Sequence, residues 1–144
     1  MTLFFGCDHA GLELKQKLIK EAQLLGWDVQ DLGVHVADPV DYPDVARLVV
    51  DQVLKNSDQD FGCLICGTGI GMSIAANRFK GIRAAVCNDS ELSAQLGRAH
   101  NNANILCLGA RIVTEETALA CLRVFLATPF EGGRHIARIA KLDL

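Results

Sequence analysis

The segment from Phe61 to Asn77 reads FGCLICGTGIGMSIAAN and contains the pattern on which the fold depends. It opens with a continuous apolar run, Phe61–Cys66, which is typical of a strand covered by helices on both faces of its sheet. Three glycines within the next five residues allow a tight turn, and the residues from Ser73 to Asn77 are typical of a helix. The segment therefore predicts a strand, a glycine loop and a helix in succession.

The same alternation of short apolar runs and helical patterns extends along the chain, and it indicates β-α units that build a parallel sheet. Apolar residues recur at helical spacing between Gly11 and Gly26, after Pro43 and before Pro129. Besides the run that ends at Cys66, four further strands are expected, at Leu3–Phe5, Trp27–Leu32, Arg83–Cys87 and Asn104–Leu108.

The expected fold class is α/β: a doubly wound, Rossmann-like open sheet of five parallel strands flanked by helices, in a single domain over residues 1–144. A C-terminal helical tail is expected from Arg134 to Leu142. We expect Ser90 to cap one helix, and Glu115 and Glu116 to occupy the first turn of another. Ligands of such folds bind outside the carboxyl ends of the strands, so the function is expected in the loops that follow strands.

Composition and charge exclude several classes of protein. Half of the 144 residues are hydrophobic and 22% are charged, which excludes a disordered chain. The net charge of −3 lacks the basic footprint of nucleic-acid binders, so we expect a small-molecule partner and no nucleic acid. The apolar run at Leu3–Phe5 is too short for a signal peptide, and no later run approaches a membrane span. We therefore expect a cytoplasmic protein with no membrane partner and with its six cysteines reduced.

Cys66 is the last residue of its expected strand and directly precedes the glycine loop. Successive N–H groups of such a loop can converge on an anion, and the positive end of the following helix favours a thiolate. The alternatives are a purely structural connection and a buried inert thiol, which is the fate expected of Cys63, Cys87 and Cys107. Cys63 and Cys66 match CxxC, but residues three apart in a strand point to opposite faces, so neither a redox nor a zinc site is expected.

Polar residues also follow the first two strands. The sequence Gly6-Cys7-Asp8-His9-Ala10-Gly11 brings a carboxylate and an imidazole to the same sheet edge as Cys66. Capping of the next helix is the competing role for Asp8. Asp41-Tyr42-Pro43 follows the second strand in a loop that can also reach this edge, where the tyrosine either faces a ligand or simply packs.

Arginines and one further histidine complete the set of candidates. Arg111 follows the fifth strand, while Arg134 and Arg138 lie one helical turn apart on the tail. Two or three guanidinium groups suit a phosphate dianion, although solvated surface arginines are the alternative. His100 precedes the fifth strand and so lies at the amino edge, opposite Cys66. Either this histidine is structural, or a second subunit brings it to the site.

Together these motifs resemble the sugar-phosphate isomerase family that includes type B ribose-5-phosphate isomerases and the allose- and galactose-6-phosphate isomerases. The resemblance covers almost the whole chain, and the motifs are specific in their order and spacing. They are GCDHAG at 6–11, DYP at 41–43, CGTGIG at 66–71, GIRA at 81–84, HN at 100–101, GAR at 109–111 and EGGRH at 131–135.

The resemblance implies an aldose–ketose isomerase of the pentose phosphate pathway that interconverts D-ribose 5-phosphate and D-ribulose 5-phosphate without a metal or organic cofactor. It also implies a homodimer, or a dimer of dimers, with shared active sites. By position, Cys66 matches the catalytic base and His100 the ring-opening acid/base from the other subunit, while Thr68 is assigned a proton relay. The positions that match substrate-binding or phosphate-binding residues are Asp8, His9, Gly67, Gly69, Ile70, Gly71, Asn101, Arg111, Arg134 and Arg138.

These residues fit the chemistry of the reaction. His100 can open the sugar ring, and a Cys66 thiolate can then move a proton from C2 to C1 through a cis-enediolate that the loop amides stabilise. Two alternatives remain open: a hexose 6-phosphate as substrate, and a non-catalytic phosphate- or nucleotide-binding module. The Val34–Val40 stretch matches nothing assignable and leaves the length of the sugar undecided.

Overall fold

A single sheet of five parallel strands in the order β2-β1-β3-β5-β4 forms the centre of the molecule in the computed structural model, which describes residues 1–143. The strands are β1 (Thr2–Cys7), β2 (Asp28–Asp31), β3 (Phe61–Cys66), β4 (Ala84–Val86) and β5 (Ile105–Gly109). The α-helices are α1 (Leu12–Leu24), α2 (Tyr42–Val53), α3 (Ile70–Ala76), α4 (Glu91–Asn101), α5 (Glu115–Ala127) and α6 (Arg134–Ala140). Short 3-10 helices are η1 (His9–Gly11), η2 (Leu54–Asn56) and η3 (Lys141–Asp143).

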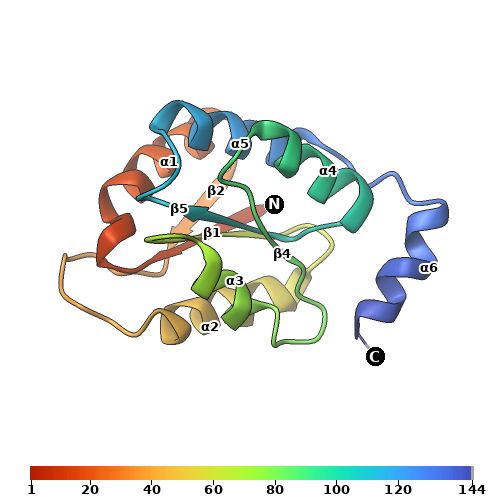
Figure 1. The fold of residues 1–144 in the computed structure, drawn as a ribbon, viewed down its shortest axis with the longest axis horizontal. Helices are drawn as coiled ribbons and strands as arrows, with labels where there is room; N and C mark the ends of the chain where they lie inside the picture. Colours follow the sequence, from red (N-terminus) through yellow and green to blue (C-terminus); the bar gives the residue numbers. More distant parts are fainter. Residues whose placement is uncertain (144) are drawn as a thin grey trace.

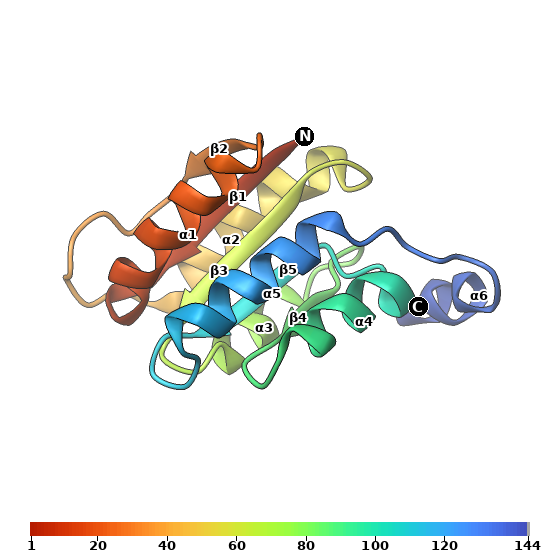
Figure 2. The ribbon, with the colours of Figure 1, turned by 90° about the horizontal axis from the view of Figure 1, so that it is seen from above.

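Helices cover both faces of the sheet, as expected. Helices α1, α5 and α4 lie side by side on one face, and α2 and α3 cover the other (Figures 1 and 2). Each face has its own apolar core, so consecutive residues of a central strand alternate between the two. Cys63 belongs to the core under α1 and α5, whereas Cys66 belongs to the core under α2 and α3. The prediction that these two thiols point to opposite faces is confirmed.

The strand order places a topological switch point at the centre of the sheet. From β1 the chain moves outward to β2, whereas from β3 it moves in the opposite direction, across β5 to β4. The carboxyl ends of β1, β3 and β5 therefore lie side by side, with Cys7 paired to Ile65 and Cys66 paired to Gly109. The residues after these strands meet in the crevice where ligands of open α/β sheets bind.

The sequence predicted the five strands to within two residues at each end, and β3 with its observed bounds. Glu115 and Glu116 lie in the first turn of α5, as expected, and Thr114 caps that helix by accepting the N–H of Thr117 at 3.1 Å. The prediction that Ser90 caps a helix is wrong as far as the side-chain hydrogen bond is concerned. Ser90 occupies the N-cap position of α4 in an extended conformation, but its side chain accepts no hydrogen bond from the helix.

Two buried cations were not expected from the sequence. Lys15 is fully buried, and its Nζ donates to Asp31 Oδ1 at 2.7 Å and to the carbonyl of Val34 at 2.5 Å. Arg98 is 6% exposed, donates to the carbonyl of Ala103 at 2.6 Å, and lies 4.5 Å above the centre of the Phe61 ring. The two cations fix the start of the loop before α2 and the end of α4.

The tail forms α6 and η3, as predicted, and α6 lies beyond the edge of the sheet rather than in either helical layer (Figure 1). Two glycines with positive φ, Gly132 at +71° and Gly133 at +56°, turn the chain into this helix. Among residues 1–143, no helix combines the length and the apolar character needed to cross a bilayer.

Candidate active site

A cleft of about 480 Å³ opens at the carboxyl edge of the sheet, above the switch point. Its volume lies within the range of small-molecule sites. The cleft takes residues from the ends of β1, β3 and β5 and from the first turns of α2 and α3. Its lining residues are Asp8, Tyr42, Cys66, Gly67, Thr68, Ile70, Gly71, Ile74 and Arg111.

Cys66 ends β3 at the floor of this cleft and is 5% exposed. Its Sγ accepts a hydrogen bond from the backbone N–H of Gly69 at 3.1 Å. Gly69 has φ +77°, in the left-handed region that favours glycine, and this conformation turns its N–H back toward the sulfur. An N–H donor aimed at a sulfur is the kind of contact that binds negative charge developing during a reaction.

The other core cysteines lie in different surroundings. Burial raises the pKa of Cys87 to about 12 and that of Cys121 to about 11. Burial also raises the pKa of Cys63 and of Cys107, which lie in the interior of the two central strands. Thiols of this kind stay protonated at neutral pH and react slowly. Cys66 is distinguished from them by its place at the cleft and by its N–H donor.

The segment after β1 gives one residue to the cleft. Asp8 lines it, and Asp8 Oδ1 also accepts the N–H of Ala10 at 3.0 Å, so its competing role as a cap of η1 is present as well. His9 begins η1 and is exposed to solvent. The structure thus brings Asp8 to Cys66 within one chain and leaves His9 beside the cleft, outside its lining.

Arg111 provides the positive charge of the cleft. Its guanidinium lies over Gly67, where an added Cβ would meet Nη1 at 3.2 Å. The backbone N–H of Arg111 donates to the Gly67 carbonyl at 3.0 Å. The hydroxyl of Thr68 accepts the N–H of Ile70 at 3.2 Å. A guanidinium beside a glycine loop is suited to an anionic group such as a phosphate or an enediolate.

Tyr42 is a lining residue whose role the sequence left open. Its ring lies directly against Gly71, where an added Cβ would come within 2.8 Å of ring carbons. The tyrosine therefore both packs on the loop and faces the cleft, and glycine at position 71 is what allows its approach. Tyr42 begins α2, after the long connection that follows β2. Hydrophobic periodicity does not predict the path of this connection, so the sequence left the position of the tyrosine open.

His100, Asn101 and Arg138 lie in a second cavity, of about 290 Å³, between the end of α4 and α6. This cavity shares no lining residue with the cleft of Cys66. The chain passes from α4 into the amino end of β5, whereas Cys66 pairs with Gly109 at the carboxyl end. The length of β5, about 13 Å at 3.3 Å per residue, therefore separates the two places.

Two imidazoles and a carboxylate surround this second cavity. His100 stacks on His135 with ring centres 4.5 Å apart and planes 15° apart. Glu131 Oε2 lies 3.6 Å from His100 Nε2 and 3.7 Å from His135 Nε2, so one carboxylate serves both rings. Burial lowers the pKa of His135, and the positive charges of His100 and Arg134 act in the same direction. Arg134 begins α6 and is exposed, outside the lining of the cavity.

The side-chain donors of His100, Glu131 and His135 lie within 4.8 Å of one another, a spacing that some metal sites have. Imidazole nitrogens bind a metal in the plane of the ring. Because the two rings are stacked with centres 4.5 Å apart, their nitrogen lone pairs lie in two nearly parallel planes, which is unfavourable for convergence on one ion. The arrangement is better suited to sharing one carboxylate between two histidines.

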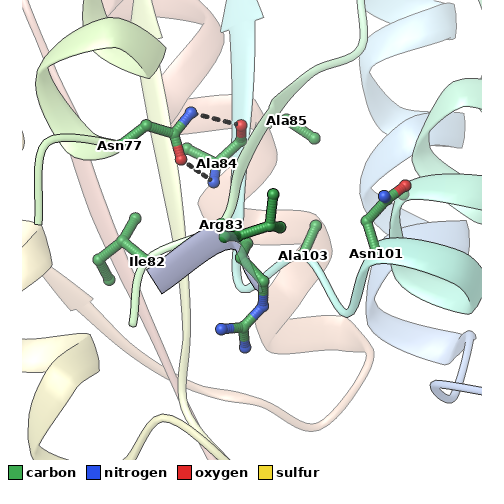
Figure 3. A pocket seen from close by; sticks show the side chains of 9 residues that line it. Asn77, Ile82, Arg83, Ala84, Ala85, Asn101 and Ala103 are labelled. Atoms are coloured by element: carbon green, nitrogen blue, oxygen red, sulfur yellow. Dashed lines mark hydrogen bonds between the residues drawn. The ribbon is translucent and has the colours of Figure 1, made fainter. Parts of the chain in front are cut away.

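Figure 3 shows a third cavity, of about 350 Å³. Asn101 and Leu142 line both this cavity and the second one. Arg83 lines it, but its guanidinium donates to the Asn102 carbonyl at 2.8 Å and to the Gly81 carbonyl at 3.3 Å. These bonds tie the segment before β4 to the end of α4, which gives Arg83 a structural role.

Comparison with known proteins agrees with this geometry. Residues 3–142 match the family model described as Ribose/Galactose Isomerase. A probable ribose-5-phosphate isomerase B from Mycoplasma genitalium is 48% identical over 142 residues, which cover 98% of this chain and 93% of the relative. Ribose-5-phosphate isomerase B from Escherichia coli is 44% identical over 135 residues, which cover 94% of this chain and 89% of that protein.

Solved structures give the same result. A ribose 5-phosphate isomerase from Thermotoga maritima matches with a TM-score of 0.93 and 48% identity, covering 99% of this chain and 97% of the other. The Mycoplasma genitalium ribose-5-phosphate isomerase B, solved with bound ribulose-5-phosphate, matches with a TM-score of 0.95 and 47% identity over 98% of this chain and 93% of that one. The cleft at the switch point, the cysteine before the glycine loop and the match over nearly the whole chain lead to one conclusion: this protein belongs to the ribose/galactose isomerase family.

Proposed function

We propose that this protein interconverts D-ribose 5-phosphate and D-ribulose 5-phosphate. The observation that carries the proposal is the sulfur of Cys66, which lies at the floor of a cleft, 3.1 Å from an N–H of the glycine loop and close to the Arg111 guanidinium. The names of the relatives, and the ribulose-5-phosphate bound by the Mycoplasma genitalium enzyme, support the same substrate pair.

The proton transfer is assigned to Cys66. Its thiolate takes the proton from C2 of the open-chain aldose, and the electron pair of the broken C–H bond forms a cis-enediolate with the charge on O1. The thiol then returns the proton to C1, while the O2 proton moves to O1 and leaves a ketone at C2. The hydroxyl of Thr68 is the assigned relay between the two oxygens, and loop N–H groups stabilise the enediolate.

Ring opening is assigned to His100. A neutral imidazole accepts the proton of the anomeric hydroxyl, and a proton returns to the ring oxygen as the C1–O4 bond breaks. Histidine can do both near neutral pH. Glu131 faces His100 Nε2 and can stabilise the imidazolium that forms. Asn101, the next residue on α4, is assigned to sugar binding.

The phosphate is assigned to three arginines. Arg111 stands at the cleft of Cys66, whereas Arg138 lines the cavity of His100 and Arg134 begins the same short helix. Asp8 and His9, beside Cys66, complete the contacts with the sugar. Paired hydrogen bonds from guanidinium groups to phosphate oxygens hold the reacting carbons in register with the sulfur.

The site is completed by a second copy of the chain. We infer a homodimer in which the cleft of Cys66 in one protomer faces the His100 cavity of its partner, and two such dimers can associate further. The separation of the two cavities in residues 1–143, with no lining residue in common, supports this arrangement. A two-fold axis would then produce two equal sites. The six free cysteines fit a reducing compartment, and on that ground we place the enzyme in the cytoplasm.

Replacement of Cys66 tests the assigned base. Cys66→Ala is expected to abolish isomerisation of ribose 5-phosphate while binding, measured by calorimetry, remains. The matched control is Cys63→Ala, three residues earlier on the opposite face of the same strand, which should keep the wild-type kcat. Near-normal turnover by Cys66→Ala would remove the basis of the mechanism, and binding by the wild-type protein without turnover would favour a non-catalytic module.

Mixing variants tests the shared site. Cys66→Ala and His100→Ala chains are each expected to be inactive, but a hybrid dimer carries both lesions in one site and neither in the other. Activity should therefore return after subunit exchange. No recovery in samples where mass spectrometry demonstrates hybrids would mean that each site is built within one chain.

Steady-state kinetics can decide which sugar phosphate is the substrate. The family model names ribose and galactose isomerases, so a six-carbon substrate is the specific competitor. Values of kcat/KM on ribose 5-phosphate and on allose 6-phosphate decide between them. A higher value on the hexose would keep the chemistry and change the substrate.

A further inference from the structure

Asn88 contacts the loop after β3, and the mechanism proposed above gives this residue no role. It lies two residues after β4, in the connection to α4, and its side-chain amide reaches across to the ends of the two central strands. Its Nδ2 donates to the Thr68 carbonyl at 2.7 Å, and its Oδ1 accepts the Gly109 N–H at 2.7 Å. One side chain thus joins the loop after β3 to the end of β5.

The bond to Thr68 acts on the same peptide unit that faces Cys66. The carbonyl of Thr68 and the N–H of Gly69 belong to one planar trans peptide, so they point in opposite directions. Asn88 binds the carbonyl end, while the N–H end donates to Cys66 Sγ at 3.1 Å. Any rotation of this peptide plane that breaks one of these hydrogen bonds also misaligns the other. Polarisation of the carbonyl by the amide also strengthens the donor at the far end.

Without that bond, the backbone of Gly69 permits a second orientation of this peptide. Gly69 has φ +77° and can adopt either sign of φ, so the plane before it can turn over at little conformational cost. A reversed plane would point the Thr68 carbonyl, an acceptor, at the sulfur and oppose a thiolate. On its other side the peptide is confined by Gly109, where an added Cβ would lie 2.5 Å from the Thr68 carbonyl carbon.

We propose that Asn88 is a positioning residue for Cys66, fixing the Thr68–Gly69 peptide so that its N–H stays on the sulfur. The proposal depends on Cys66 as the base of the proposed function for its effect on turnover. Its effect on the thiol itself is independent of the isomerase activity. An amide is required at this position because one partner is a carbonyl and the other an N–H, so the side chain must both donate and accept.

Two substitutions separate these requirements. Asn88→Leu keeps the number and branching of the side-chain heavy atoms and makes neither bond. Asn88→Asp can still accept from Gly109, but its carboxylate cannot donate to Thr68 and repels that carbonyl. The matched control is Asn77→Leu, because Asn77 also clamps a backbone, with one donated and one accepted bond at 2.9 and 2.8 Å to Ala84 (Figure 3). Neither bond involves the loop after β3.

The experiment measures alkylation of Cys66 by iodoacetamide as a function of pH, with the modified peptide quantified by mass spectrometry, alongside kcat and KM. Both Asn88 variants are expected to shift the midpoint of alkylation upward by about one pH unit, which lowers the rate of alkylation about tenfold at any pH well below the wild-type midpoint. Turnover should fall about tenfold or more, with KM within a factor of two or three, since removal of an oxyanion-type donor itself costs 10²–10³. Asn77→Leu should lose comparable thermal stability and keep the wild-type midpoint.

The outcomes are distinguishable. An Asn88→Asp protein that is folded and alkylates with the wild-type midpoint overturns the proposal, even where Asn88→Leu is too unstable to measure. A midpoint that moves equally in Asn77→Leu also overturns it, because the effect would then be general loosening. If the wild-type protein does not isomerise ribose 5-phosphate, the proposed function fails, yet the alkylation shift still decides the role of Asn88.

Discussion

Gly69 combines two constraints whose energies can be separated by substitution. Its φ of +77° is left-handed, which costs an alanine about 1–2 kcal/mol. An added Cβ would also lie 2.9 Å from the carbonyl carbon of Leu108 and 3.2 Å from the N of Gly109. These are backbone atoms of the central strand β5 and cannot move aside, so overpacking adds about 1–3 kcal/mol. Gly69→Ala should therefore lower the free energy of unfolding by about 2–5 kcal/mol.

The control for this substitution is Gly26→Ala. Gly26 has φ +88°, but an added Cβ there would meet no atom within 4 Å, so only the conformational cost of about 1–2 kcal/mol applies. The assay is urea unfolding of both variants, followed by circular dichroism, with kcat on ribose 5-phosphate as a second readout. Gly69→Ala should lose about 100-fold in kcat as its N–H moves off Cys66, while Gly26→Ala should keep the wild-type value. Equal stability losses in the two variants would refute the packing argument.

Three further predictions concern charged groups. Asp31→Ala removes the carboxylate partner of the fully buried Lys15 ammonium and leaves only the Val34 carbonyl to accept from it. This change should lower the free energy of unfolding by about 3–5 kcal/mol in chemical denaturation, and a loss below about 1 kcal/mol would contradict the reasoning. The pKa of His135 is lowered in the folded state, so below pH 6.5 the unfolded chain binds more protons and stability falls with acidification. Between pH 7 and 5.5, the melting temperature of His135→Gln should therefore fall less than that of the wild type. Equal decreases in melting temperature would count against this role of His135. Arg111→Met should raise KM for ribose 5-phosphate about 10- to 100-fold in steady-state kinetics, with Arg111→Lys in between, and an unchanged KM would remove this arginine from the phosphate site.

The part of the fold that the sequence could predict is local. The bounds of β3 follow from an uninterrupted apolar run that stops at a glycine, and the opposite placement of Cys63 and Cys66 follows from the two-residue period of a strand. Likewise, the position of His100 before β5 is enough to place it at the opposite end from the glycine loop. The first two inferences depend on adjacent residues alone, and the third needs only the parallel direction of the strands.

The remaining features depend on contacts between distant segments. In the sequence, Lys15 looks like any charged residue of a helix. Its burial is possible because its Nζ donates to Asp31 and to the Val34 carbonyl. Asn88 looks like an ordinary turn residue until the loop after β3 is placed beside it. Glu131 becomes a shared acceptor only once α6 returns to the end of α4. Ser90 shows the reverse error, because a residue favourable for capping occupies the cap position without making the bond.

The two cavities assigned to the proposed site differ in how firmly the chain anchors them. The segment around Cys66 is fastened to the middle of the sheet by the N–H groups of Ala110 and Arg111, which donate to the carbonyls of Cys66 and Gly67 at 2.8 and 3.0 Å. Helix α6 lies beyond the edge of the sheet (Figure 1), and the chain enters it through Gly132 and Gly133. Amide protons of Ala110 and Arg111 should thus exchange with deuterium only through global unfolding, and those of α6 through local opening. A sugar phosphate would then meet one preformed wall and one that adjusts as it is captured.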